Sequence, residues 1–507
     1  MQENIIDKVF IIDDKYEEVL PVIQALAKKG IPTIYWNGNV DTKPEYPLSG
    51  IRLVILDMRF SFVTDSHTIN TNLFNLLKNA ISYENGPYIL FIWSKHDNEY
   101  LEDFRADLRK ESEIPQPYLI VNMEKNKFMK TISEKNEIYE EIASTLNTAN
   151  NIEIKKEILD ILENVGLSDS IERIKTKENA VEELMDTLDE KLKEANALYI
   201  LLIWESLVRT SASKLVNDIA SFSEFDETWD NNIKTLIQHL ALANAGKALG
   251  ETAKEYIINA MSSLNHMLPD ELWNQIMGQH IDENNFSFIN EPSIIKEIDN
   301  NIYSISKTNT KFIIKENNSD YTSFRSLSQI NEGADKQLCE ELYNLYLVFL
   351  ANSNSKLLCE KVNSNCIKKP GGLYKIDNPE FSGELINSIF KNNANINTDN
   401  ISLIKLDISS SCDYAQDKLK RIRILWGLMI DQSCFSYINN TEDIYCTPII
   451  KTNDKIVKLV FNFHYISNES KDILEQSEKL FSFRELLLTE IKHKLSTYIS
   501  RVGIINL

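Results

Sequence analysis

Four polar residues near the amino terminus have the types and the spacing that phosphoryl transfer to an aspartate requires. Asp13 and Asp14 follow one apolar run, Asp57 follows a second, and Ser94 follows a third. Two adjacent carboxylates with a third beside them form an oxygen-rich site that suits Mg²⁺. The metal would screen the charge of Asp57 from that of the incoming phosphoryl group, and Ser94 would donate a hydrogen bond to a phosphoryl oxygen.

A lysine is needed to complete the charge balance of such a site, and two candidates follow a later apolar run. Lys125 is the first choice, with Lys127 as the alternative. Lys95, directly after Ser94, would either gate the site or contact the phosphoryl group itself. The predicted site therefore draws its carboxylates, its hydroxyl and its lysines from separate segments of the chain.

The apolar runs that precede these residues predict buried strands. They are continuous and rich in β-branched and aromatic side chains, which is typical of parallel strands covered on both faces. The runs are residues 9–12, 31–36, 53–56, 88–93 and 118–121. Helical stretches alternate with them, and this pattern implies right-handed crossovers in a five-stranded, doubly wound parallel α/β sheet. Because ligands bind beyond the carboxyl ends of such strands, the carboxylates and the hydroxyl are expected at one edge.

In strand order, element count and residue chemistry, this first quarter of the chain resembles the receiver domain of two-component response regulators. The resemblance implies that Asp57 accepts a phosphoryl group from a sensor histidine kinase, that Ser94 reports the modification and that Lys125 pairs with it. It also implies a Mg²⁺ ion bound by Asp13, Asp14 and Asp57. The receiver-like region is expected to end near residue 130.

The chain departs from the receiver pattern at several positions. Lys95 stands where the family has a small residue that leaves access for the phosphoryl donor, and Asn126 stands where proline usually follows the lysine. Asn122 and Met123 occupy the part of the fifth strand where an aromatic switch residue is expected. Acceptance of a phosphoryl group is therefore better supported than a conventional conformational switch.

The length of the chain predicts several cores, since it has 507 residues and a domain averages about 150. Three domains are expected: a receiver-like domain over residues 1–130, a mostly α-helical domain over 131–325 and an α+β domain over 326–507. Alternating strands in the last region favour a small β-barrel or sandwich, and a terminal helix over 483–499 follows it.

Composition limits the classes of partner. The net charge of −21 opposes broad binding to a phosphate backbone, so nucleic acid is not expected, and the basic residues 418–423 are interpreted as a solvated helix face. No apolar run is long enough for a membrane span, and the start lacks the features of a signal peptide, so a cytoplasmic protein is expected. The six cysteines lack a C-x-x-C pair, which favours reduced thiols.

The most distinctive segment of the last third is residues 410–416, Ser-Ser-Cys-Asp-Tyr-Ala-Gln, directly after a predicted strand. Cys412 and Asp413 would lie at a strand-to-helix junction, where a helix amino terminus favours the thiolate form of cysteine. The alternative is a buried cysteine beside an aspartate that caps the helix. Signatures of nucleotide-binding loops, hydrolases and zinc sites are absent from the sequence, so no enzyme activity is expected beyond phosphoryl transfer to its own aspartate.

The same segment resembles a motif of bacterial receiver-linked proteins, whose closing Arg-x-Gly corresponds to Arg501 and Gly503. The whole architecture is similar to receiver proteins of Detocs-type two-component-like phage-defence systems. That similarity implies a sensor histidine kinase and a separate effector-bearing regulator from the same operon as partners, with this chain accepting or buffering phosphoryl groups. Two alternatives stay open: a degenerate receiver that serves as a scaffold or interaction module, and a receiver that controls an unrecognised carboxyl-terminal effector.

Overall fold

In the computed structural model, the chain divides into two compact units. Unit one comprises Met1–Ile219 and Leu268–Ser287, and unit two comprises Ala220–Met267 and Phe288–Leu507. The three-domain division at residues 130 and 325 is not tested by this partition and stays a prediction. The structure describes residues 6, 8–58, 66–94, 101–134, 141–142, 144–146, 156–159, 161–162, 171–177, 179–194, 196–246, 249–279, 292–330, 333–361, 369–376, 379–390, 396–415, 419, 421–452, 455–470, 474 and 477–500.

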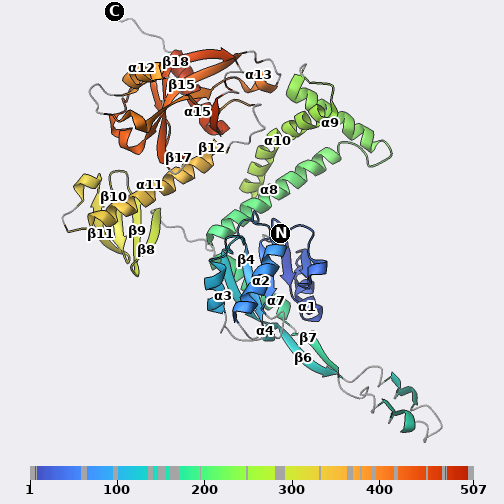
Figure 1. The fold of residues 1–507 in the computed structure, drawn as a ribbon. Helices are drawn as coiled ribbons and strands as arrows, with labels where there is room; N and C mark the ends of the chain where they lie inside the picture. Colours follow the sequence, from blue (N-terminus) through green and yellow to red (C-terminus); the bar gives the residue numbers. More distant parts are fainter. Residues whose placement is uncertain are drawn as a thin grey trace, which may run out of the picture. The chain divides into compact units, whose positions relative to one another are not determined.

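Unit one contains the five-stranded parallel sheet that the apolar runs predict (Figure 1). Its strands are β1 (Val9–Ile12), β2 (Thr33–Trp36), β3 (Leu53–Asp57), β4 (Ile89–Ser94) and β5 (Leu119–Glu124). Their order is β2-β1-β3-β4-β5, which confirms the doubly wound topology. All residues of β1 and β3 are buried, although successive side chains of a strand point to opposite faces. Both faces of the sheet are therefore covered.

Helices cover the two faces. One face packs against α2 (Ser66–Ala80) and α3 (Leu101–Leu108). The other packs against α1 (Tyr16–Lys28) and α7 (Ala180–Glu194). Side chains of β1 alternate between these two cores, as expected for a strand in the middle of a layered α/β structure.

The face covered by α1 is completed by residues well beyond position 130. After β5 the chain forms α4 (Lys125–Phe128) and β6 (Met129–Glu134), and β6 pairs antiparallel with β7 (Ile171–Thr176). Leucine side chains of α7 and of the start of α8 (Asn196–Ala220) then join the core of the sheet. Sequence analysis missed β6 and β7, because it assigned this part of the chain to helices.

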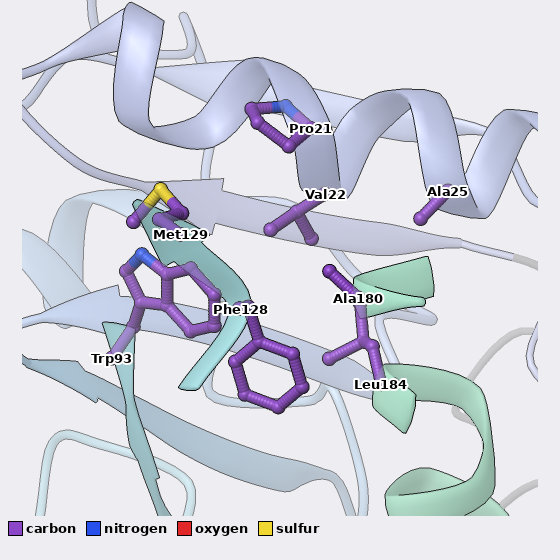
Figure 2. A pocket seen from close by; sticks show the side chains of 8 residues that line it. All are labelled: Pro21, Val22, Ala25, Trp93, Phe128, Met129, Ala180 and Leu184. Carbon is purple, nitrogen blue, oxygen red and sulfur yellow. The ribbon is translucent and has the colours of Figure 1, made fainter. Parts of the chain in front are cut away.

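Trp93 and Phe128 join the end of β4 to α4 inside this core. Their ring centroids lie 5.6 Å apart with an angle of 24° between the ring planes. Both rings line a small apolar cavity of about 10 Å³, bounded by side chains of α1 and α7 (Figure 2). The indole Nε1–H of Trp93 has no hydrogen-bond partner among the described residues. Packing therefore accounts for the position of the indole.

We expect Phe128→Ala to lower the free energy of unfolding by about 3–5 kcal/mol, because it removes a buried ring next to an existing cavity. Urea denaturation followed by far-UV circular dichroism measures the change. Tyr83→Ala is the control, since Tyr83 is 70% exposed, and it should change stability by no more than about 0.5 kcal/mol. Equal losses in both variants would contradict the packing role of Phe128.

The helical middle region is confirmed by α8 together with α9 (Trp229–Ala245) and α10 (Ala253–Gly278). Its helices combine polar and apolar residues along their length. Over the described residues, no helix has the length and the apolar character that crossing a membrane requires.

Unit two contains a four-stranded antiparallel sheet that sequence analysis assigned to helix, and that assignment was wrong. Its strands are β8 (Ser293–Ile298), β9 (Asn301–Lys307), β10 (Phe312–Glu316) and β11 (Ser319–Phe324). Two-residue turns connect β8 to β9 and β10 to β11, and their residues have positive φ: Asp299, Asn300, Asn317 and Asn318. Asn and Asp tolerate this conformation, so the tight hairpins follow from the turn residues.

The carboxyl-terminal part of unit two is an eight-stranded sheet that curls into a half-barrel, as the alternating strands predict (Figure 1). Its strands are β12 (Cys359–Glu360), β13 (Gly372–Ile376), β14 (Ile401–Asp407), β15 (Arg421–Asp431), β16 (Ile444–Cys446), β17 (Ile450–Thr452), β18 (Lys455–Ser470) and β19 (Glu478–Phe483). The accompanying helices are α11 (Lys336–Leu358), α12 (Pro379–Ile389), α13 (Ser411–Ala415) and α15 (Glu485–Ile499), with short 3₁₀ helices at Leu327–Gln329, Thr398–Asn400 and Gln432–Tyr437. A further 3₁₀ helix, Val40–Thr42, belongs to unit one.

The described arginines of the basic cluster lie on a strand, not on a helix. Arg421 and Arg423 of β15 are exposed, whereas Ile422 between them is buried. This alternation is the period of a strand with one face on a core. The helical interpretation of residues 418–423 was therefore wrong at these positions, although the two arginines are solvated as expected.

Candidate functional site

The carboxyl ends of β1 and β3 bring three aspartates together. These strands pair in register, with Ile12 beside Leu56, so the residues that follow them emerge side by side. Carboxylate oxygens of Asp13, Asp14 and Asp57 lie within 4.8 Å of one another. Asp13 and Asp57 are 1% and 6% exposed, whereas Asp14 is exposed. The cluster is thus buried on one side and open to solvent on the other.

Lys125 joins two of these aspartates to a further carboxylate. Its Nζ lies 2.7 Å from Oδ2 of Asp13, 2.9 Å from Oδ2 of Asp57 and 2.9 Å from Oε2 of Glu18. Lys125 begins α4 directly after β5, and it is only 1% exposed. An ammonium group has three N–H donors, and three carboxylate acceptors meet them here. The lysine is therefore held in one position.

Glu18 is the site residue that sequence analysis missed. It lies in the first turn of α1 and is 2% exposed, although it is an acidic residue. It stands on the same buried helix face as Val22 and Ala25, at the spacing of an apolar stripe. A carboxylate within such a stripe was the signal that could have identified it, because a buried charge requires a partner.

Asp13 also accepts hydrogen bonds from the residues that follow it and from the neighbouring strand β2. The backbone N–H of Lys15 donates to Oδ1 of Asp13 over 2.9 Å, and the hydroxyl of Tyr35 donates to the Asp13 carbonyl oxygen over 2.8 Å. The Nζ of Lys15 lies 3.6 Å from Oε1 of Glu18. These contacts tie the loop between β1 and α1 to β2, so the carboxylates are positioned before a ligand arrives.

The remaining predicted residues are placed only in part. Ser94 is the last residue of β4 and pairs with Glu124 of β5, so its backbone lies at the carboxyl edge of the sheet. The side chains of Ser94 and Lys127 lie outside the described residues, and so does the whole of Lys95. The roles assigned to these three residues stay predictions.

Burial and neighbouring charges shift the ionisation of the cluster. Burial raises the pKa of Asp13 to about 6, with the nearby Asp57 charge adding to the rise and Lys125 opposing it. Burial lowers the pKa of Lys125, but the carboxylates of Asp57 and Asp13 raise it more, so its pKa lies above the ordinary value. The ammonium of Lys125 therefore stays charged at neutral pH. The three carboxylates that it contacts outnumber its single positive charge.

The raised pKa of Asp13 makes stability depend on pH in one direction. Native Asp13 keeps its proton up to about pH 6, whereas the unfolded chain releases it near pH ~4. Its contribution to the free energy of unfolding is thus present below pH ~4 and is lost as the pH rises through about 6. We expect a loss of about 2–3 kcal/mol over this interval in metal-free wild-type protein, measured by urea denaturation.

Asp13→Asn should lack this component of the pH dependence, because asparagine does not titrate. Asp41→Asn is the matched control at an exposed position of the same unit, and it should keep the wild-type dependence on pH. A wild-type slope between pH ~4 and ~6 in Asp13→Asn would contradict the assignment of the titration to Asp13.

The donor set fits a hard divalent cation. All of the candidate ligand atoms are carboxylate oxygens, supplied by Asp13, Asp14 and Asp57. Mg²⁺ usually keeps several of its water ligands when it binds to a protein. Asp14 is exposed, so there is access for these water molecules at the site. A dication would also offset the excess of carboxylates over the single ammonium of Lys125. The acidic cluster could therefore bind a metal ion.

The segment that contains Cys412 is anchored by a buried aspartate that sequence analysis did not single out. Asp407 ends β14, is 1% exposed and accepts hydrogen bonds from the Tyr414 hydroxyl and the backbone N–H of Ser409. Asp413 is half-buried on the short helix α13, and the side chain of Cys412 lies outside the described residues. The bonds to Asp407 fix α13 against β14, and the predicted thiolate stays a prediction.

Comparison with known proteins adds no family assignment. No protein-family model, no curated protein and no solved structure matches the chain. The sheet and the acidic cluster are compatible with a receiver-like fold on their own geometry.

Proposed function

We propose that this chain is a two-component signalling protein that accepts a phosphoryl group on Asp57 from the phosphohistidine of a partner sensor kinase. One observation carries the proposal: the Nζ of Lys125 lies 2.9 Å from Oδ2 of Asp57, inside a cluster of aspartates that could hold Mg²⁺. Phosphoryl transfer to a carboxylate needs a metal ion between the like charges and a fixed cation for the phosphoryl oxygens. Lys125 of unit one could serve as the fixed cation, and the three aspartates could hold the metal ion.

In the proposed reaction, a carboxylate oxygen of Asp57 forms a bond to phosphorus as the P–N bond of the phosphohistidine breaks. The imidazole leaves with the electron pair of that bond and takes up a proton from solvent, and an acyl phosphate is left on Asp57. Mg²⁺ on Asp13, Asp14 and Asp57 would supply charge neutralisation between the reactants. Lys125 donates to a phosphoryl oxygen in place of its present bond to Oδ2, and Ser94 donates to another.

Transfer from a small phosphoryl donor tests this reaction without the kinase. Incubation of the wild-type protein with acetyl phosphate and Mg²⁺ should add one phosphoryl group per chain, as measured by intact mass. Reductive trapping of the acyl phosphate followed by peptide mapping should place it on Asp57. A gain in mass at another residue, or no gain at all, would refute the proposal.

The proposed partners follow from the resemblance to Detocs-type phage-defence systems. The donor would be a sensor histidine kinase in the cytoplasm, and a separate effector-bearing regulator of the same operon would compete for its phosphoryl groups. A phosphoryl group that resides on Asp57 is withheld from that regulator. This chain would therefore buffer an antiviral signal by raising the amount of kinase activity needed to trigger the effector.

A further inference from the structure

The ammonium of Lys125 is shared between two kinds of carboxylate. Asp13 and Asp57 both belong to the cluster whose oxygens could hold a metal ion. Glu18 also binds the ammonium, with Oε2 at 2.9 Å from Nζ, but among the described residues it is not part of that cluster. Among the described residues, Glu18 is therefore the acceptor of Lys125 that is not also a candidate metal ligand.

The three acceptors also lie on three different segments of the chain. Glu18 is on α1, Asp13 follows β1 and Asp57 ends β3. Because a lysine has only three N–H donors, two acceptors that stay in place fix the direction of the third. Phosphorylation changes the acceptor on Asp57 alone. Glu18 and Asp13 are then the groups that keep the third N–H aimed at the oxygens on Asp57.

From this geometry we propose that Glu18 is a positioning residue that holds the Lys125 ammonium for the phosphoryl group on Asp57. The inference rests on the proposed function, and it adds Glu18 to the machinery of the site. The carboxylate acts through its reach, because a side chain from the first turn of α1 must span to Nζ at hydrogen-bond distance. Its charge alone, placed further away, would not fix the ammonium.

Three variants of Glu18 separate the effect of side-chain length from the effect of charge. Glu18→Gln keeps the length and an acceptor oxygen but removes the charge. Glu18→Asp keeps the charge but is one methylene shorter. Glu18→Met keeps the length and most of the volume but has no strong acceptor, and it replaces the aspartate variant if that one does not fold. Glu17→Gln and Glu17→Asp are matched controls on the neighbouring exposed residue of the same helix turn.

The test measures beryllofluoride binding to the full chain at saturating Mg²⁺ by isothermal titration calorimetry. The Kd for Mg²⁺ alone and the urea stability without metal are measured beside it. We expect Glu18→Asp and Glu18→Met to bind beryllofluoride at least about tenfold more weakly, as loss of a charge-assisted hydrogen bond predicts. Glu18→Gln should stay within about threefold of the wild type, and so should both Glu17 variants. The Kd for Mg²⁺ should change by less than the Kd for beryllofluoride.

The outcomes distinguish this inference from the proposed function. A wild-type protein that binds no beryllofluoride would overturn both. Wild-type binding with unchanged affinity in Glu18→Asp and Glu18→Met would overturn the positioning role alone. Weak binding by Glu18→Gln with normal binding by Glu18→Asp would also overturn it, because charge and not reach would then be the property that matters.

Discussion

Replacing Asp57 by Asn is expected to abolish both phosphoryl acceptance and the stabilisation that beryllofluoride gives in the presence of Mg²⁺. Beryllofluoride mimics a phosphoryl group by binding an aspartate carboxylate, and the asparagine amide offers it no charged oxygen. At a ligand concentration 100 times its Kd, the wild-type protein should gain about 2.7 kcal/mol of stability. In a unit of more than 200 residues, that gain corresponds to a rise in Tm of roughly 5 °C or more, which differential scanning fluorimetry resolves.

Asp41→Asn is the control for this experiment, because it removes an exposed carboxylate from the same unit and should keep the full rise in Tm. Mg²⁺ without beryllofluoride gives the contribution of the metal alone. A rise in Tm that persists in Asp57→Asn would mean that the ligand binds elsewhere. A wild-type protein with no rise would favour the alternative in which the receiver-like unit serves as a scaffold.

Lys125→Met is expected to lower the free energy of unfolding by about 3–5 kcal/mol at pH 7 in the absence of metal. The substitution removes the ammonium that contacts all three of Asp13, Glu18 and Asp57, and it leaves their charges buried without that partner. Methionine has a similar length, so the loss of packing is small compared with the loss of charge pairing. Urea denaturation measures the effect.

Mg²⁺ should restore part of the stability of Lys125→Met, because a dication replaces the missing positive charge beside the aspartates. Lys110→Met is the matched control. Its ammonium lies 2.9 Å from Asp107, but the lysine side chain is 74% exposed, so the loss of stability should be much smaller than at Lys125. Similar losses at the two positions would show that the buried cluster contributes no more than a surface ion pair.

The parallel sheet was predictable because its strands are buried on both faces. That burial produces continuous apolar runs, which end where the ligand edge of the sheet begins. The convergence of Asp13 and Asp57 followed from the same rule, since neighbouring parallel strands end at one edge. The choice of Lys125 required only that the fifth strand end near it. All three positions follow from the common direction of parallel strands, and none of them requires knowledge of contacts between distant side chains.

Glu18 could not be found by the same rule, because it lies on helix α1 and does not follow a strand, and its partner Lys125 is more than a hundred residues away in the chain. Helix α7 lies in the region predicted to be helical, but its packing against the parallel sheet was not predicted. Its apolar stripe resembles that of any surface helix. In the sequence, the hairpin of β6 and β7 lies between α7 and the last strand of the sheet that α7 covers. Periodicity identifies the element in such a case, but it does not identify the surface against which the element packs.

The hairpins of unit two were missed although their signal is local. Asp299 and Asn300 form a two-residue turn with positive φ between alternating strands, and Asn317 and Asn318 form another. Such pairs are strong hairpin signals when the flanking residues alternate. The long charged helices that precede them in the chain made a helical interpretation of the whole region more persuasive than the local turn chemistry.

The late position of α7 in the chain affects synthesis of the protein on the ribosome. One face of the parallel sheet has α1 but lacks its second covering helix, α7, until Glu194, the last residue of α7, has been translated. At a translation rate of about 5–20 residues per second, roughly 4–14 seconds separate the end of β5 from the end of α7. During that time Val22, Trp93 and Phe128 have no α7 to pack against. The nascent chain therefore presents an apolar surface to chaperones for longer than it would if the covering helix followed β5 directly.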